Sequence, residues 1–139
     1  MRVVIAGGHG QIALILEKLL AARGDVPVGL VRNPAHVSDL AAIGAEAVVL
    51  DLESSPVQQV AEALRGADAV VFAAGAGPGS GVDRKQTVDR DAAILLADAA
   101  ESAGVDRYVM VSAISADDRS LDDGYDEVFL SYILSLIHI

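Results

Sequence analysis

Apolar residues recur along the chain in two alternating patterns, which predict strands and helices in turn. Runs of β-branched and other apolar residues at 3–5, 26–31, 47–50, 69–72 and 108–111 are typical of buried strands. Between these runs, apolar residues recur every three or four positions, as they do on one face of a helix. The positions with this helical spacing are Ile12, Ile15, Leu16, Leu19 and Leu20; Val37, Leu40 and Ala41; Val57, Val60, Ala61 and Leu64; and Val88, Ala92, Leu95, Leu96, Ala99 and Ala103.

Glycines mark the ends of the predicted helices. Gly24, Gly44, Gly66 and Gly104 each follow a helical stretch, where a residue in the left-handed conformation commonly ends a helix. Five nearly continuous apolar strands joined by helices predict a parallel sheet that helices cover on both faces. Because such crossovers are right-handed, the expected fold class is α/β: a Rossmann-type, doubly wound parallel sheet of five strands with flanking helices.

Composition narrows the classes of function. Twenty acidic residues against ten basic ones give a net charge of −10, and the lack of a basic patch in the sequence argues against nucleic-acid binding. No apolar run reaches the roughly 20 residues needed to cross a bilayer, so we expect no membrane partner and a cytoplasmic location. The chain contains no cysteine, which excludes a disulfide framework and thiolate catalysis. The histidines His9, His36 and His138 lie far apart in the sequence and do not suggest a metal site.

A glycine-rich segment, residues 7–13, lies between the first predicted strand and the first predicted helix. Gly7, Gly10 and Ala13 have the spacing of a dinucleotide-binding turn. Gly7 permits a sharp exit from the strand, Gly10 lets the backbone approach a pyrophosphate, and Ala13 lets the helix pack closely on the sheet. The helix N-terminus supplies amides and a partial positive charge for the phosphates. The alternative is a glycine-rich connection that binds nothing, and His9 is expected to be an exposed residue of this turn and not a catalyst.

The end of the second strand favours NADP(H) over NAD(H). NAD-preferring sites usually place there an acid that holds the ribose 2′-hydroxyl. Here Val31 is followed by Arg32, and the nearest upstream acid, Asp25, precedes the strand. The Arg32 guanidinium is suited to stack on adenine and to pair with a 2′-phosphate. The alternative is an arginine of the solvated surface.

Two further strand ends are expected to complete the site. Asp51 is placed to accept a hydrogen bond from the adenine amino group, with Leu52 beneath the base, although an aspartate that initiates a helix gives the same pattern. Small residues after the fourth strand leave space for the ribose and the nicotinamide. The predicted cofactor contacts are Gly7, Gly8, His9, Gly10, Gln11, Ile12, Arg32, Asp51, Leu52, Ala73, Ala74 and Gly75.

These motifs resemble those of the atypical short-chain dehydrogenase/reductase family, in its NAD(P)H-binding or NmrA-like subgroup. The resemblance covers residues 1 to about 132 and rests on the glycine-rich turn, on residues 31–34, 51–52 and 72–75, and on the stretch from 88 to 113. It implies that Ser112 orients a substrate carbonyl at the nicotinamide end of the cleft. A turn serine is the alternative for Ser112.

The resemblance also implies that Tyr132 is the proton donor of a catalytic dyad. Relatives with complete catalytic machinery carry a lysine four residues after this tyrosine, and the lysine lowers its pKa. Here that position is Leu136. Because an unperturbed tyrosine has a pKa of about 10, we expect the dyad to be incomplete.

The last six residues, 134–139, depart from the family pattern, which continues with a helix, a sixth strand and a substrate-binding segment. A transposon end used in preparing sequencing libraries encodes this hexapeptide. We therefore expect a C-terminally incomplete NAD(P)-binding Rossmann domain of residues 1–133, followed by a non-native, adapter-encoded tail at 134–139. The alternative is a genuine apolar tail that packs on the domain.

The resulting hypothesis is the NADP(H)-binding domain of an oxidoreductase of the short-chain dehydrogenase/reductase type, with an unknown small molecule as substrate. We expect the truncated form to be inactive, so that enzyme activity belongs to the parent protein. Two alternatives remain: a non-catalytic NAD(P)-sensing regulatory protein, and a flavin or quinone reductase. The pattern of apolar residues does not indicate the oligomeric state.

Overall fold

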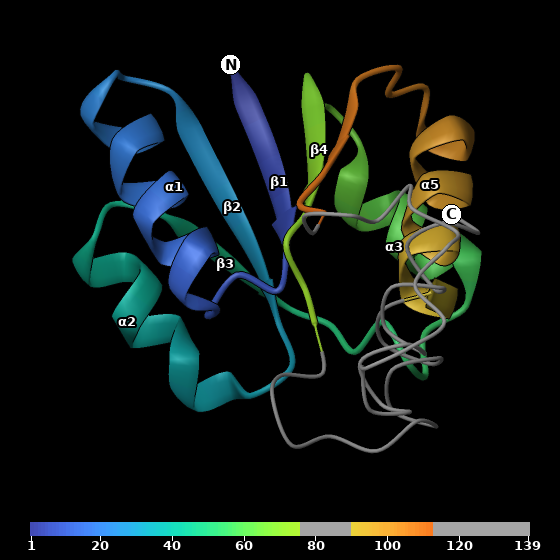
Figure 1. The fold of residues 1–139 in the computed structure, drawn as a ribbon, viewed down its shortest axis with the longest axis horizontal. Helices are drawn as coiled ribbons and strands as arrows, with labels where there is room; N and C mark the ends of the chain where they lie inside the picture. Colours follow the sequence, from blue (N-terminus) through green and yellow to red (C-terminus); the bar gives the residue numbers. More distant parts are fainter. Residues whose placement is uncertain (76–89, 113–139) are drawn as a thin grey trace, which may run out of the picture.

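Five parallel strands form one sheet in the computed structural model, which describes residues 1–75 and 90–112 (Figure 1). The strand order is β3-β2-β1-β4-β5, with every neighbouring pair parallel. The Rossmann-type doubly wound sheet predicted from the sequence is therefore confirmed. The strands are β1 (Arg2–Ala6), β2 (Val26–Val31), β3 (Glu46–Val49), β4 (Ala69–Phe72) and β5 (Tyr108–Met110).

Helices follow the strands as the apolar spacing predicts. They are α1 (Gln11–Ala22), the 3-10 turn η1 (Pro34–His36), α2 (Val37–Ala42), α3 (Val57–Leu64) and α5 (Ala92–Ala103). The four glycines predicted to end helices, at 24, 44, 66 and 104, all have φ between +75° and +85°. Outside the described residues lie the predicted helical position Val88, the predicted proton donor Tyr132 and the tail at 134–139.

The first strand is one residue longer at each end than the predicted 3–5, and the third begins one residue earlier than predicted, at Glu46. Two strands also end one residue before their predicted ends. The third strand ends at Val49 and not at Leu50, and the fifth ends at Met110 and not at Val111. In both cases one further backbone bond continues the ladder, because Leu50 N–H donates to Val31 O at 2.9 Å and Val111 N–H donates to Phe72 O at 2.9 Å. The apolar pattern thus marks how far the chain stays hydrogen-bonded to its neighbour, one residue beyond the regular strand.

The helices lie in two layers, with α1 and α2 on one face of the sheet and α3 and α5 on the other (Figure 1). The α3–α5 layer encloses the largest core cluster, in which Val4, Val28 and Val70 from the sheet pack with Leu64 and Leu96. The α1–α2 layer has two smaller clusters. The core is therefore unevenly divided between the two faces.

Helix α1 buries only part of the face predicted from its apolar spacing. Leu20 is buried and Leu16 packs against the core, but Ile12, Ile15 and Leu19 are 57%, 63% and 59% exposed. The other buried side chains of α1 are Ala13 and Glu17. The reason is the glycine-rich turn before the helix: it places Ala13 against the sheet, and the residues one and two turns later follow on the same face.

Strand order also determines where a ligand fits. After β1 the chain proceeds to β2 and β3 on one side, and after β4 it proceeds to β5 on the other. The connections that follow β1 and β4 therefore diverge, which leaves a crevice at the carboxyl ends of these two strands. Because the predicted site residues follow β1, β2, β3 and β4, the topology brings them to the same edge of the sheet.

Candidate cofactor-binding site

The turn after β1 is held in a geometry that only glycine tolerates. Gly7 has φ +77°, and a Cβ at this position would lie 2.6 Å from Ala74 Cα. A Cβ at Gly8 would lie 2.6 Å from Gly29 Cα, because the turn passes close to β2. The Gly8 N–H donates to Leu30 O at 3.0 Å, and the Gly10 N–H donates to Gly7 O at 2.8 Å. The turn is therefore both close-packed and fixed by its backbone bonds.

The start of α1 is suited to an anion. Gly10 is the N-cap residue, and no side chain of the described residues caps the helix there. The first turn also contains no acidic residue. The first amides of an α-helix have no partner within the helix, and they carry part of its positive dipole end. A phosphate group placed at this turn would find donors that no side chain occupies.

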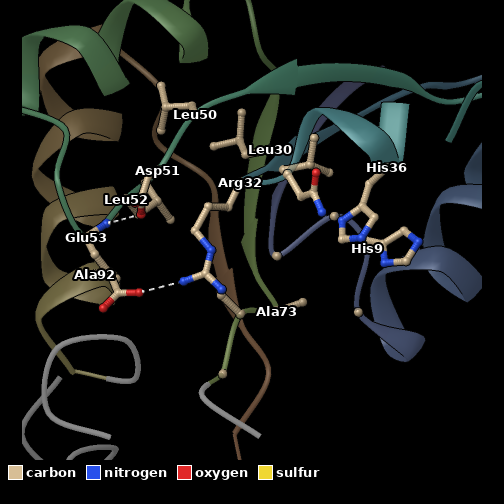
Figure 2. Close-up of a pocket in the computed structure, with 17 residues that line it drawn as sticks. His9, Leu30, Arg32, His36, Leu50, Asp51, Leu52, Glu53, Ala73 and Ala92 are labelled. Atoms are coloured by element: carbon tan, nitrogen blue, oxygen red, sulfur yellow. Dashed lines mark hydrogen bonds and ion pairs between the residues drawn. The ribbon is translucent and has the colours of Figure 1, made fainter. Parts of the chain in front are cut away.

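A pocket of about 540 Å³ opens beside this turn, at the carboxyl edge of the sheet (Figure 2). Ten of the twelve predicted cofactor contacts line it: Gly7, Gly8, His9, Gly10, Arg32, Asp51, Leu52, Ala73, Ala74 and Gly75. Gln11 and Ile12 do not, and the Ile12 side chain is 57% exposed. Gln11 and Ile12 would therefore contact the cofactor only through their backbone amides.

Arg32 and Glu53 form an ion pair at the wall of this pocket. Arg32 follows β2 and Glu53 follows the paired strand β3, and Arg32 Nη1 lies 3.1 Å from Glu53 Oε1 (Figure 2). The arginine side chain is 60% exposed and the glutamate 24%. Sequence reasoning singled out Arg32 but missed Glu53, since only the register of β2 and β3 brings the two loops together.

Asp51 forms a local turn but does not initiate a helix, because α3 begins at Val57 with Pro56 as its N-cap residue. Its Oδ1 accepts a hydrogen bond from the Glu53 N–H at 2.9 Å, and its backbone carbonyl accepts one from the Ser55 N–H at 2.9 Å. The Asp51 side chain also lines the pocket, together with Leu52. The same carboxylate that shapes the turn therefore faces the space predicted for adenine.

Two histidines that are distant in the sequence stack on each other at the pocket. The His9 and His36 rings are parallel to within 7°, with centroids 3.5 Å apart (Figure 2). His9 Nε2 lies 2.8 Å from Asp39 Oδ2, on α2. The His9 side chain is 33% exposed, so the predicted exposed histidine is partly covered. No local sequence pattern predicts this pair, because it forms only when the loops after β1 and β2 meet.

A carboxyl group is buried directly beneath the glycine-rich turn. The Glu17 side chain, on α1, is 0% exposed, and neither of its oxygens has a hydrogen-bond partner among the described residues. A Cβ added to Gly29 would lie 2.7 Å from Glu17 Oε1, and one added to Gly8 would lie 3.1 Å from it. Burial raises the pKa of the Glu17 carboxyl to about 7. The protein therefore places a titratable group behind the turn, where the apolar spacing gave no hint of one.

Of the two predicted catalytic residues, the structure describes only Ser112. Ser112 is exposed, two residues beyond β5, and it does not line the pocket. Tyr132 lies outside the described residues. The structure also shows no group of histidine, cysteine and acidic side chains able to hold a metal ion within residues 1–75 and 90–112.

A glycine-rich turn, an uncapped helix start and a pocket across the switch in strand order define a dinucleotide-binding α/β domain. Comparison with protein families agrees: the family described as NAD(P)H-binding matches residues 7–135, and the chain belongs to it. The pocket fits such a cofactor, since Gly7, Gly8 and Gly10 of its phosphate turn carry no side chain and Arg32 supplies a cation in its wall. Its ligand is therefore a nicotinamide dinucleotide.

Individual relatives are considerably longer than this chain. The "Uncharacterized sugar epimerase YhfK" of Bacillus subtilis is 37% identical over 136 residues, which are 97% of this chain and 62% of that protein. The UPF0659 protein YMR090W of Saccharomyces cerevisiae is 38% identical over 122 residues, 86% of this chain and 53% of that one. A solved structure from Bacillus halodurans, provisionally named an NAD-dependent epimerase/dehydratase, is 34% identical, with a TM-score of 0.85 over 97% of this chain and 60% of that one. The chain thus spans about three fifths of the length of these relatives.

Among residues 1–75 and 90–112, no helix has both the length and the apolar content needed to span a membrane.

Proposed function

We propose that the pocket prefers NADP(H) to NAD(H), and that Arg32 is the residue that makes the distinction. The observation that carries this proposal is the position of Arg32: it directly follows β2, it lines the pocket, and its side chain is 60% exposed. In Rossmann-type sites an acid near this strand end binds the ribose 2′-hydroxyl, whereas an arginine accommodates a 2′-phosphate. A guanidinium offers several donors in one plane, which suits a phosphate group.

The remaining contacts follow from the direction of the dinucleotide along the pocket. The pyrophosphate would lie on the turn of Gly7, Gly8 and Gly10 and on the first amides of α1, including those of Gln11 and Ile12. The adenine would lie between Arg32 and the Asp51–Leu52 segment. His9 borders the phosphate turn and would contact the cofactor from the side of α2.

The nicotinamide would lie at the β4 end of the pocket. Ala73, Ala74 and Gly75 line this end, and their small side chains leave room for a ribose and a flat ring. The bound cofactor supplies hydride transfer, and the chain supplies its binding and orientation. Ser112 and Tyr132 are the residues we propose to act on the substrate, as the resemblance to short-chain dehydrogenases/reductases of the NmrA-like subgroup implies.

We propose an oxidoreductase or epimerase of a small molecule as the activity of the longer protein of which this domain would be part. An epimerase that uses such a cofactor also proceeds through hydride transfer, so both reactions need the same domain. The relative named a sugar epimerase supports a carbohydrate substrate class. Residues 1–133 would be the native portion of this domain, and 134–139 the adapter-encoded tail.

Affinity for the two cofactors tests the proposal directly. Binding of NADPH and NADH to the 139-residue chain would be measured by titration calorimetry, for the wild type and for Arg32→Ala. A charged hydrogen bond is worth about 1.5–3 kcal/mol, so we expect NADPH to bind roughly ten- to a hundredfold more tightly than NADH. Arg32→Ala should reduce this ratio to about one, mainly through weaker NADPH binding.

Arg65→Ala is the matched control. Arg65 is similarly exposed, at 70%, and it pairs with Glu62 at 2.8 Å, but it does not line the pocket. The control should leave both affinities within about twofold of the wild type. Equal binding of NADPH and NADH by the wild type would refute the cofactor preference. Failure of both cofactors to bind would refute the assignment of the pocket.

A further inference from the structure

We propose that Glu53 is a second residue that sets the cofactor preference, and that it acts by occupying the Arg32 guanidinium. This inference rests on the proposed role of Arg32 and extends it. In the structure the guanidinium is already bonded to a carboxylate, with Arg32 Nη1 at 3.1 Å from Glu53 Oε1. A 2′-phosphate that approaches Arg32 must therefore share this cation with Glu53 or displace it.

The position of Glu53 is fixed by the backbone. Its N–H donates to Asp51 Oδ1 at 2.9 Å, and the Ser55 N–H donates to the Asp51 carbonyl at 2.9 Å, which together close a tight turn. This turn follows the bond from Leu50 N–H to Val31 O at 2.9 Å, the last link between the β2 and β3 segments. Glu53 is therefore attached to the same rigid sheet edge as Arg32, and Figure 2 shows the two side chains extended toward each other across the pocket.

The negative charge of Glu53 determines in which direction it changes the affinity for NADP(H). The carboxylate neutralises part of the field that Arg32 offers to a dianionic 2′-phosphate, and it repels that phosphate at short range. A unit charge about 6 Å from a dianion in water-like surroundings changes its affinity by roughly tenfold. NAD(H) has a hydroxyl at this place, so it does not meet this repulsion at the 2′-position. Glu53 thus lowers the preference for NADP(H) below the value that Arg32 alone would give.

The substitution Glu53→Gln tests this role, because glutamine keeps the size of the side chain and removes its charge. The backbone bond from residue 53 to Asp51 is unaffected by the change. We expect the dissociation constant of NADP⁺ to fall by roughly tenfold at low ionic strength, and that of NAD⁺ to change by less than about twofold. The gain should shrink in concentrated salt, where charges at the pocket mouth are screened.

Glu62→Gln is the matched control for net charge. Glu62 is also paired with an arginine, Arg65 at 2.8 Å, and it does not line the pocket. This variant removes the same charge from the chain but should alter neither affinity by more than about twofold. An equal gain in Glu62→Gln would assign the effect to net charge and overturn the inference.

A double substitution separates this inference from the proposed function. If Glu53 acts in part by occupying the guanidinium, the effect of Glu53→Gln on NADP⁺ should be clearly smaller in the Arg32→Ala background than in the wild type, because only the direct repulsion of the phosphate remains there. An effect of the same size in both backgrounds would overturn the inference and leave the role of Arg32 standing, and so would unchanged NADP⁺ affinity in Glu53→Gln alone. If Arg32→Ala itself leaves the NADP⁺ to NAD⁺ ratio unchanged, the proposed function fails first.

Discussion

Helices α1 and α5 have the same length and a similar apolar content, but α1 leaves more of its large apolar side chains exposed. Each has twelve residues. Helix α5 buries five small or apolar side chains, Ala92, Ala93, Leu96, Ala99 and Ala100, against the sheet and α3. Helix α1 buries Ala13, Glu17 and Leu20 and exposes Ile12, Ile15 and Leu19.

The difference shows that a binding turn can fix the rotation of the helix that follows it. The contacts of Gly7 with Ala74 and of Gly8 with Gly29 hold the turn close to β4 and β2. Helix α1 must continue from that turn, so its face toward the sheet is determined before hydrophobicity can select it. Helix α5 is not joined to such a turn within the described residues, and its apolar spacing agrees with its burial.

The largest effect that tests this comparison comes from one substitution made in both helices. Leu96 is 0% exposed and lies in the main core cluster, so Leu96→Ala should lower the free energy of unfolding by about 2–5 kcal/mol. Leu19 is 59% exposed, so Leu19→Ala should change it by less than about 0.5 kcal/mol. Urea unfolding of the two variants measures both values. A loss of several kcal/mol in Leu19→Ala would mean that α1 buries the face that its sequence pattern predicts.

The same contrast explains how much the sequence could predict. Apolar runs and glycines predicted five strands and the helices between them, because strand burial and helix caps depend on neighbouring residues in the sequence. The glycine-rich turn and the residues that follow the second, third and fourth strands predicted ten lining residues of the pocket for the same reason. The pairs Arg32–Glu53 and His9–His36 depend on which loops become neighbours after the sheet has formed. No local pattern encodes that adjacency.

Glu17 could not be found from the sequence for a different reason. A glutamate among apolar residues at 12, 15, 16, 19 and 20 reads as the polar face of an amphipathic helix. Glu17 lies on the buried face of α1 because the glycine-rich turn sets the rotation of this helix. A functional motif therefore made the local rule fail one turn beyond the residues of the motif itself.

The second prediction concerns the pH dependence that this buried carboxyl gives to folding. Its pKa is raised from 4.5 to about 7 by burial, so between these values the folded protein holds a proton that the unfolded chain has released. The free energy of unfolding should therefore fall as the pH rises from 4.5 to 7, by about 3 kcal/mol in all, and stay at the lower value above 7.

Glu17→Gln isolates this contribution, because glutamine has nearly the same shape and does not titrate. The difference in unfolding free energy between wild type and Glu17→Gln, measured by urea unfolding at several pH values, should follow the slope given above. Glu62→Gln, at a side chain that is 62% exposed on α3, keeps Glu17, so its unfolding free energy should show the same slope as that of the wild type. A wild type whose stability is parallel to that of Glu17→Gln from pH 4.5 to 7 would show that the carboxyl is solvated when the protein is folded.

The smallest predicted effect comes from substitutions at the ends of α1 and α5, where we expect both helices to lose the same stability. Gly24 follows α1 with φ +85°, and Gly104 follows α5 with φ +75°; a Cβ at either position would meet no described atom within 4 Å. Alanine at either site therefore encounters only the backbone cost of the left-handed conformation, about 1 kcal/mol, and no difference in packing. Gly24→Ala and Gly104→Ala should lower the free energy of unfolding by equal amounts, within about 0.5 kcal/mol, in the same urea experiment. If only Gly104→Ala lowered the free energy of unfolding, neighbouring residues would constrain the end of α5 and not that of α1. The difference between α1 and α5 would then include their ends as well as their rotation. Equal losses would confine the difference to the start of α1, where the glycine-rich turn sets its orientation.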